Sequence, residues 1–302
     1  SALCLKSGNA VLLKGGSEAA ETNRVLADII SSATDGAGIP QGWLGLLETR
    51  GDVAEVLGMD RYIDLLIPRG SNAFVRRIMD NTHIPVMGHA DGICHVYVDK
   101  LADPDMAVRI ATDSKCQYVA VCNAAETILV HQDAAQTVLP GLKTALEQQH
   151  VEIRGCERTA AMIDVKPATD QDWQTEYLDL IVSVRLVDSL DAAIDHINRY
   201  GSGHTDVIVT ADRHRGMRFM DYVDSANTFV NCSSRFSDGF RFGLGAEVGI
   251  STSKIHARGP VGLEGLVIYK WRLMGDGHVV ADYAGSRARS FTHRKLPKKF
   301  KW

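Results

Sequence analysis

The fold is decided first by residues 8–32, which read GNAVLLKGGSEAAETNRVLADIISS. The short apolar run at residues 10–14 follows a Gly-Asn turn and predicts a strand that is buried on both faces. Gly15 and Gly16 end this run. From residue 18 the apolar side chains recur at the spacing of one helix face, so residues 18–32 predict a helix. The stretch as a whole predicts a strand, a glycine turn and a helix.

The same kind of unit recurs further along the chain. Residues 62–67 predict a second strand, and Ser71 is typical of the N-cap of a helix that extends towards Asp80. Residues 84–87 form another short apolar run. Strands that alternate with helices predict a parallel sheet covered on both faces, an architecture that binds nucleotides at the carboxyl ends of its strands. We therefore expect residues 1–98 to form a cofactor-binding domain.

A second α/β region is predicted from residue 99 to residue 258. Asp103 followed by Pro104 is typical of a helix start, and this helix should extend through Asp113. The later elements of the region are two strands and an amphipathic helix closed by a glycine, at residues 126–131, 180–187 and 189–201. We expect residues 99–258 to form the catalytic domain, which should be the smaller of the two folded lobes.

The remainder, residues 259–302, is expected to form a C-terminal return. Its apolar run at residues 266–270 predicts a strand, which we expect to make a contact between the subunits of a homo-oligomer. The complete prediction is an α/β chain with a parallel-sheet nucleotide-binding domain, a smaller α/β catalytic domain and a C-terminal oligomerisation strand.

The composition argues against polyanions and membranes as partners. The chain has 33 Lys and Arg against 37 Asp and Glu, a formal net charge of -4, whereas a phosphate backbone requires clustered excess cation. The basic run at residues 295–302 is interpreted as an exposed charged terminus. No segment approaches the roughly 20 uninterrupted apolar residues of a membrane helix. We expect neither a nucleic acid nor a membrane as partner.

Cysteine spacing indicates a reducing compartment. The six cysteines are Cys4, Cys94, Cys116, Cys122, Cys156 and Cys232. They form no CxxC pair and show no metal-ligand spacing, so we expect free thiols, a cytoplasmic location and no metal site.

Residues 114–127, SKCQYVAVCNAAET, carry the most chemistry. Cys122 falls in a break between a predicted helix and a predicted strand, among small side chains that let a substrate approach. Loops at such edges are where nucleophiles usually lie. The pattern alone leaves open that any single cysteine here is a small buried hydrophobe. Cys116 is the rival nucleophile.

Several ordered blocks resemble one known family. These blocks are LKSGNA at residues 5–10, IPRGS at 67–71, GHADGICH at 88–95, CNA at 122–124, and a run from RFSDG at 235–239 through IHARGP at 255–260. From residue 5 to at least residue 291 the chain resembles the γ-glutamyl phosphate reductases, and the reductase half of the pyrroline-5-carboxylate synthases, within the aldehyde dehydrogenase superfamily. The resemblance implies an aldehyde dehydrogenase-like fold. It also implies NADPH-dependent reduction of L-glutamate 5-phosphate to L-glutamate 5-semialdehyde and phosphate, in proline biosynthesis.

The resemblance identifies the nucleophile as Cys122, since the family uses the cysteine of its Cys-Asn-Ala block. Attack on the acyl phosphate would expel phosphate and leave a thioester, which a hydride from NADPH would reduce. Aldehyde dehydrogenases that hydrolyse their thioester carry a glutamate base, which residues 88–92 replace here. The thioester should therefore wait for hydride. We expect His89 in that block to be structural.

Two sets of binding residues are expected around Cys122. The resemblance implies that Lys14 reaches the adenosine ribose of the cofactor and that Glu176 holds the nicotinamide ribose. Gly70 and Ser71 start a predicted helix, and the free backbone N–H groups there suit a cofactor phosphate. The expected cofactor set is Lys14, Ser17, Glu18, Gly70, Ser71 and Glu176. Guanidinium groups suit the carboxylate and phosphate of the substrate, and the expected substrate set is Asn123, Arg235 and Arg241. The alternatives are that Lys14 and Glu176 are ordinary charged residues and that Gly70 and Ser71 form a plain turn and N-cap. Arg235 and Arg241 could instead form internal ion pairs.

The start of the chain departs from the family pattern. Family members have a further N-terminal stretch with an Arg-Pro-Asn-Val-Thr block, and the chain opens after it at Ser1 without a signal-peptide pattern. We therefore expect a chain that lacks upstream sequence. The alternative functions are a generic aldehyde dehydrogenase and an inactive fragment or subunit with a binding role. The resemblance also implies glutamate 5-kinase as the pathway partner.

Overall fold

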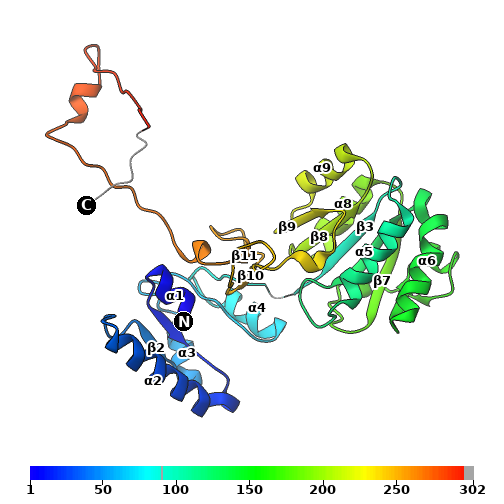
Figure 1. Cartoon of the computed structure of the whole chain (residues 1–302), viewed down its shortest axis with the longest axis horizontal. Coiled ribbons are helices and arrows are strands. Elements are labelled where there is room, and N and C mark those ends of the chain that lie inside the picture. The colour runs from blue at the N-terminus through cyan, green and yellow to red at the C-terminus, as the bar shows by residue number, and fades with distance from the viewer. Residues whose placement is uncertain (90, 296–302) are drawn as a thin grey trace. The chain divides into compact units, whose positions relative to one another are not determined.

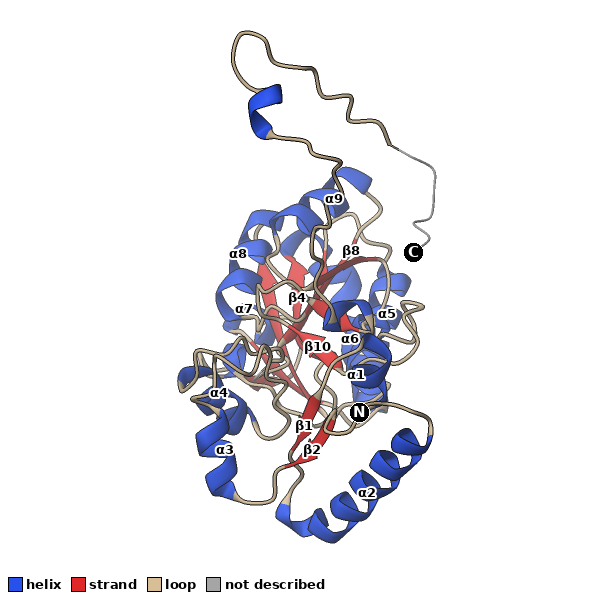
Figure 2. Ribbon diagram, turned by 90° about the vertical axis from the view of Figure 1, so that its left-hand side faces the viewer, coloured by secondary structure: helices blue, strands red, loops and turns tan. Residues whose placement is uncertain are grey.

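The computed structural model describes residues 1–89 and 91–295 and has two compact units, Ser1–Val267 and a C-terminal unit that begins at Ile268 (Figure 1). The larger unit holds a seven-stranded sheet in the order β6-β5-β7-β4-β3-β8-β9. All of its neighbouring strands are parallel. Figure 2 shows the strands in red and the helices in blue. The strands are β3 (Cys94–Val98), β4 (Ala125–His131), β5 (Glu152–Gly155), β6 (Lys166–Pro167), β7 (Ile181–Val187), β8 (Thr205–Val209) and β9 (Asn227–Val230). The predicted α/β architecture with a parallel sheet is confirmed, but the seven strands lie within residues 94–230, whereas the sheet was predicted within residues 1–98.

Helices cover both faces of this sheet, and they are α5 (Pro104–Cys116), α6 (Ala135–Gln148), α7 (Glu157–Ala160), α8 (Leu190–Tyr200) and α9 (Arg213–Tyr222). Side chains alternate along β3, so Val96 and Val98 belong to the core with α5 and α6, while Tyr97 packs with α8 and α9. Every residue of β3 and β4 is buried, as expected for a parallel sheet covered twice. No helix in the described part of the chain has the length and apolar character needed to cross a membrane.

The elements predicted for this sheet are confirmed, because their signals are local. Asp103 caps α5 by accepting a hydrogen bond from the Met106 N–H at 2.8 Å, and Pro104 is its first residue. Ser189 caps α8 in the same way through the Ala192 N–H, and Gly201 ends it. The apolar runs predicted as strands coincide with β4 and β7.

The N-terminal elements are smaller than the sequence predicts. They are α1 (Ala2–Ser7), β1 (Val11–Leu13), the 3-10 turn η1 (Ser17–Ala19), α2 (Ala20–Gly36), β2 (Leu44–Leu46), α3 (Arg50–Val56) and α4 (Asn72–Asp80). β1 pairs in parallel with β2. The strand and the helix predicted within residues 8–32 are thus present, but burial of β1 on both faces is wrong, because Leu12 is 53% exposed. Ser71 caps α4 as predicted.

The strand predicted at residues 62–67 is wrong. Only Leu66 pairs, through an isolated parallel bridge to Val86, and Tyr62 is 84% exposed. An apolar run becomes a strand only where a neighbour offers backbone partners. The domain boundaries proposed at residues 98 and 258 stay predictions; β3, which precedes the first of them, belongs to the seven-stranded sheet.

The glycine-rich segment forms a small hairpin of its own. It pairs β10 (Gly249–Ser251) with β11 (Gly259–Val261) in antiparallel fashion. Short 3-10 turns lie around it and elsewhere in the larger unit, η2 (Gln132–Ala134), η3 (Asp172–Gln174), η4 (Ser234–Phe236) and η5 (Glu264–Leu266).

The strand predicted at residues 266–270 is also wrong. Irregular chain follows η5, and Ile268 and Tyr269 are each 83% exposed. The C-terminal unit contains one 3-10 turn, η6 (Val280–Tyr283), among its described residues. A subunit contact through this segment stays a prediction.

Candidate active site

The predicted nucleophile lies in the loop between α5 and β4. α5 ends at Cys116 and β4 begins at Ala125, so Cys122 is next to the amino end of a central strand. The sequence prediction of a helix-to-strand break is confirmed. Cys116 belongs to α5 and packs against the core that α5 and α6 share.

Gly92 brings Cys122 and Glu176 against one backbone segment. A Cβ atom added at Gly92 would lie 2.5 Å from the Cys122 Cα and 2.6 Å from Glu176 Oε1. Contacts this short are not sustained by real side chains, so only glycine lets the three segments meet. The predicted cofactor residue Glu176 is therefore beside the predicted nucleophile.

Glu176 is held by a residue that the sequence reasoning missed. Asn72, the first residue of α4, donates from Nδ2 to Glu176 Oε2 at 2.9 Å and to Asp91 Oδ1 at 2.7 Å. The amide thus fixes the carboxylate while leaving its second oxygen for another partner. Its position directly after the N-cap Ser71 was the only available signal.

A pocket of about 130 Å³ opens among these segments. Its polar lining includes Arg69, Gly70, Asn72, His89 and Glu176. The structure thus brings together two of the predicted cofactor residues, Gly70 and Glu176, from segments that are far apart in the sequence. Arg69, another missed residue, donates from Nη2 to the Val248 carbonyl at 2.5 Å.

Ser71 is next to Gly70 as the N-cap of α4, and the other three predicted cofactor residues form a separate group at the turn after β1. Lys14, Ser17 and Glu18 are exposed. Lys14 Nζ donates to the Gly15 carbonyl at 2.5 Å, and the Glu18 carboxylate lies against Gly16. Their cofactor role stays a prediction.

Burial raises the pKa of the Cys122 thiol to about 11, and the nearby Glu176 carboxylate acts in the same direction. Arg69 acts against them. A thiol with this pKa is protonated at neutral pH, so formation of the thiolate requires a cation or a base close to sulfur. Arg69 is the cation that lowers the pKa of Cys122 in this structure.

Of the predicted substrate residues, Asn123 lies in the Cys122 loop, and Arg235 and Arg241 lie at the turn that faces it. The Asn123 side chain donates from Nδ2 to the Ser237 backbone carbonyl at 2.7 Å. The Asn123 backbone carbonyl accepts a hydrogen bond from Ser234 Oγ at 2.6 Å. Arg235 donates from Nε to Gln117 Oε1 at 2.9 Å, and the Arg241 guanidinium donates to the Arg235 carbonyl. The amide of Asn123 therefore positions the loop.

Two histidines lie close to Cys122. One ligand atom from each of His89, Cys122 and His204 falls within 4.8 Å of the others. The two imidazole rings meet edge to face, with centroids 4.9 Å apart. His204, which directly precedes β8, was not selected by the sequence reasoning.

A buried ion pair closes the loop at its base. Lys115 Nζ lies 2.6 Å from Glu126 Oε2, and both side chains are fully buried. Burial raises the pKa of Glu126 to about 7, although Lys115 opposes the shift. The sequence carried a signal for this pair that was not used. Lys115 is a charge near the end of a core helix, and Glu126 is a charge inside an apolar strand.

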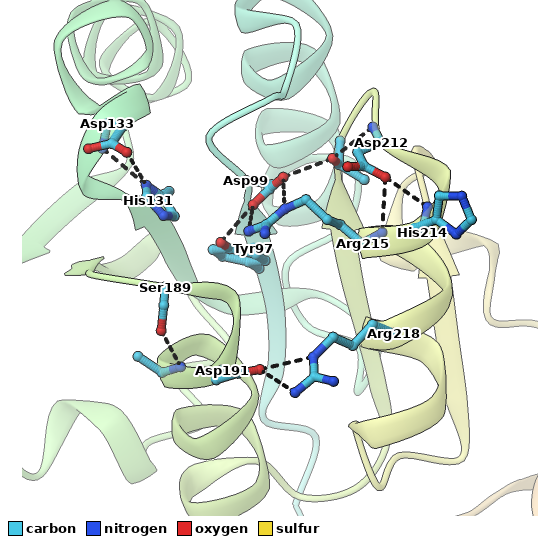
Figure 3. A network of polar contacts seen from close by, with 12 residues as sticks. Tyr97, Asp99, His131, Asp133, Ser189, Asp191, Asp212, His214, Arg215 and Arg218 are labelled. Atoms are coloured by element: carbon cyan, nitrogen blue, oxygen red, sulfur yellow. Dashed lines mark hydrogen bonds and ion pairs between the residues drawn. The ribbon is translucent and has the colours of Figure 1, made fainter.

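The opposite, carboxyl edge of the sheet carries a second polar cluster (Figure 3). Arg215 donates to Asp99 from Nε at 2.8 Å and from Nη2 at 2.5 Å. Burial would raise the pKa of Asp99, but these hydrogen bonds outweigh it and the pKa is lowered. A pocket of about 370 Å³ adjoins the cluster, and its Arg218 pairs with Asp191 at 2.9 Å. Because the charges are paired internally, we interpret this cluster as structural.

Comparison with known proteins identifies the family of this chain. Residues 1–171 match the aldehyde dehydrogenase family. The γ-glutamyl phosphate reductase of Pelotomaculum thermopropionicum is 67% identical over 300 residues, which are 99% of this chain and 69% of that protein. The reductase of Acetivibrio thermocellus is 65% identical over 300 residues, with the same coverage. The chain belongs to the γ-glutamyl phosphate reductases, within the aldehyde dehydrogenase family.

A solved γ-glutamyl phosphate reductase shares the fold. The crystal structure of the Thermotoga maritima reductase matches with a TM-score of 0.89 and 42% identity, covering 92% of this chain and 68% of that one. The family and the aldehyde dehydrogenase-like fold predicted from the ordered blocks are thereby confirmed.

Proposed function

We propose that this chain reduces L-glutamate 5-phosphate to L-glutamate 5-semialdehyde and phosphate with NADPH, through a thioester on Cys122, as a step of proline biosynthesis. The observation that carries the proposal is the place of Cys122. It lies between a turn with two arginines and a pocket lined by Glu176, in a chain 67% identical to a γ-glutamyl phosphate reductase.

The residues of this chain suit the first chemical step. As the Cys122 sulfur bonds to the acyl carbon, the bond from that carbon to the phosphate oxygen breaks and phosphate leaves. The thiol proton is lost before or during attack, and the positive charge of Arg69 favours the thiolate. Arg235 and Arg241 are proposed to hold the anionic groups of the substrate. Burial and the neighbouring Arg241 lower the pKa of Arg235, and Cys122 acts against them, so guanidinium and sulfur are within electrostatic reach.

The pocket beside Cys122 fits one end of a nicotinamide cofactor. Glu176 lines it and can accept hydrogen bonds from ribose hydroxyl groups. Gly70 and the N-cap Ser71 directly precede α4, where the free backbone N–H groups of a helix start suit a phosphate. When bound, NADPH supplies the hydride that reduces the thioester to the aldehyde. The Cys122 sulfur then leaves as a thiolate and takes up a proton.

The adenosine end is proposed to lie on Lys14, Ser17 and Glu18. The ammonium group of Lys14 is exposed and suits a 2′-phosphate, which favours NADPH over NADH. Homo-oligomer formation, glutamate 5-kinase as pathway partner and a cytoplasmic location complete the proposal. The six free cysteines fit a reducing compartment.

In the proposed function the thioester on Cys122 is reduced by hydride and is not hydrolysed by water. Two carboxylates, Glu176 and Glu247, act on the Cys122 pKa, and both accept hydrogen bonds, from Asn72 and from the Gly239 N–H at 2.8 Å. The matched relatives are reductases.

Turnover tests the proposal directly. Glutamate, ATP and glutamate 5-kinase generate the acyl phosphate in place, and NADPH oxidation by the chain is followed by absorbance. We expect oxidation that depends on the kinase and stops with Cys122→Ser. Cofactor binding without turnover would identify an inactive subunit.

A further inference from the structure

The cluster of His89, Cys122 and His204 has the composition of a metal site. Its three side chains come from separate segments, and their ligand atoms all lie within 4.8 Å of one another. Two imidazoles and one thiolate form a donor set that favours zinc over magnesium or calcium, which prefer oxygen ligands. The cysteine spacing in the sequence had predicted no metal site, because these ligands are far apart along the chain.

Both rings use Nδ1 for a bond to the protein. His89 Nδ1 lies 2.9 Å from the Ile250 carbonyl oxygen, which can only accept, so Nδ1 carries the proton and Nε2 has a lone pair. His204 Nδ1 lies 2.8 Å from Thr205 Oγ1. In metal sites the second ring nitrogen usually makes such a bond to a carbonyl or another polar group, which fixes the tautomer.

An independent observation points to a missing ligand. The side chain of His204 is fully buried, and its Nε2 has no hydrogen-bond partner among the described residues. Buried polar atoms are nearly always paired, and each unpaired one calls for an explanation. A metal ion between His204 and its two neighbours would supply that partner.

We propose that His89, Cys122 and His204 bind one Zn²⁺ ion, with a fourth position left for water. Bonds of about 2.0–2.1 Å to nitrogen and about 2.3 Å to sulfur require the three ligand atoms to move closer together by only about 1 Å. As the bond from sulfur to zinc forms, the thiol proton passes to solvent.

A zinc ion in this position occupies the sulfur atom that the proposed reaction uses. Zinc and the acyl phosphate are therefore mutually exclusive at Cys122, and zinc acts as a reversible inhibitor that also shields the thiol from alkylation. This inhibition rests on the proposed function. Metal binding does not, and it can be measured in a protein with no turnover.

Cobalt spectroscopy on the purified full chain tests the site. Tetrahedral Co²⁺ bound by a thiolate gives visible d–d bands and a near-ultraviolet charge-transfer band, and stoichiometric Zn²⁺ should displace it. We expect one Co²⁺ per chain, loss of the charge-transfer band in Cys122→Ser, and weaker binding in His89→Gln and His204→Gln. Loss of an outer-shell partner typically lowers metal affinity by roughly 10- to 100-fold. Each histidine variant loses a direct ligand, so its Co²⁺ affinity should fall by at least as much.

His83→Gln, at an exposed histidine, and Cys156→Ser, at a thiol outside the cluster, are the controls and should bind as wild type. His204 is buried, so circular dichroism must first show that His204→Gln is folded; the partly exposed His89→Gln carries the test if it is not. Unchanged Co²⁺ affinity in a folded His89→Gln would overturn the three-ligand site, as would a spectrum without a thiolate band. Zinc inhibition that persists in His89→Gln would show binding to the thiol alone and would also overturn it.

Discussion

Lys115 and Glu126 form a fully buried ion pair, 2.6 Å from Nζ to Oε2, at the two ends of the loop that carries Cys122. Glu126 also accepts a hydrogen bond from the Leu178 N–H at 3.4 Å, two residues after Glu176. One carboxylate therefore connects the helix before the nucleophile, the strand after it and the segment of the proposed ribose ligand. The buried pair thus joins both ends of the loop that carries Cys122.

Removing one member of this pair should destabilise the protein strongly. Lys115→Met leaves the Glu126 carboxylate buried without its partner, which typically costs about 3–5 kcal/mol. Lys115→Met with Glu126→Leu removes both charges and should recover most of the loss. Urea unfolding measures the effect, and Lys143→Met, at an exposed pair, is the control, with an expected cost of about 1 kcal/mol or less. A Lys115→Met cost as small as the control's would show that the buried pair is not needed.

The sequence predicted the elements whose signals are local. Asp103 with Pro104 and Ser189 identified the starts of α5 and α8 because a cap acts within three or four residues. Residues 62–67 and 266–270 failed because a strand needs a partner, and no period or composition shows whether one lies beside it.

The site residues could likewise be predicted only where their sequence signal is local. Cys122 was selected through its block and its position in a loop, both visible in sequence. Arg69, Asn72 and His204 were missed, since they come near the site only when α4 and β8 meet the loop. Arg69 lies inside the block at residues 67–71 and Asn72 directly follows it, whereas the sequence around His204 carries no comparable signal.

Cys122→Ser should abolish reduction and leave NADPH binding nearly intact, because only the covalent step uses the sulfur. Fluorescence titration measures binding, and the coupled assay measures turnover. Iodoacetamide should abolish turnover by modifying Cys122 and not Cys116, as peptide mass analysis would show. Preferential labelling of Cys116, with turnover lost in Cys116→Ser, would transfer the nucleophile's role to that residue.

Lys14→Ala should raise the apparent KM for NADPH more than that for NADH, because only NADPH has a 2′-phosphate for the ammonium group. Steady-state kinetics with each cofactor measure the difference. Lys6→Ala, another lysine near the start of the chain, is the control and should change neither constant. Equal losses for the two cofactors would refute the contact with phosphate.

Gly92→Ala should lower kcat by about 100-fold or more, because the new methyl group displaces the Cys122 backbone, and misplacement of about 1 Å can cost this much. Gly36→Ala is the control, since an added Cβ at Gly36 has no atom within 4 Å. Turnover, with circular dichroism as a check of folding, distinguishes the two variants. Wild-type kcat in Gly92→Ala would mean that the loop can move without loss of function.

The reverse reaction should depend on inorganic phosphate. Oxidation of glutamate semialdehyde with NADP forms the thioester on Cys122, and phosphate must then attack its carbonyl carbon and expel the thiolate. The two carboxylates that act on the Cys122 pKa, Glu176 and Glu247, both accept hydrogen bonds. Residues 88–92, which replace the glutamate block of the hydrolytic enzymes, contain no glutamate. Without phosphate, NADPH should form in one burst that matches the enzyme concentration, and the acylated chain should be detected by its mass.

Arg235 and Arg241 supply the physical reason for this dependence, since guanidinium groups beside the acyl carbon can hold a phosphate dianion. Arg241→Gln should therefore raise the phosphate concentration needed for half-maximal turnover more than it raises the KM for NADP. The assay follows NADPH absorbance at fixed ionic strength, with sulfate replacing phosphate in the control. Sustained turnover in sulfate that yields free glutamate would mean that a carboxylate near Cys122, Glu176 or Glu247, activates water in spite of its hydrogen bond. The chain would then catalyse the hydrolytic chemistry of an ordinary aldehyde dehydrogenase.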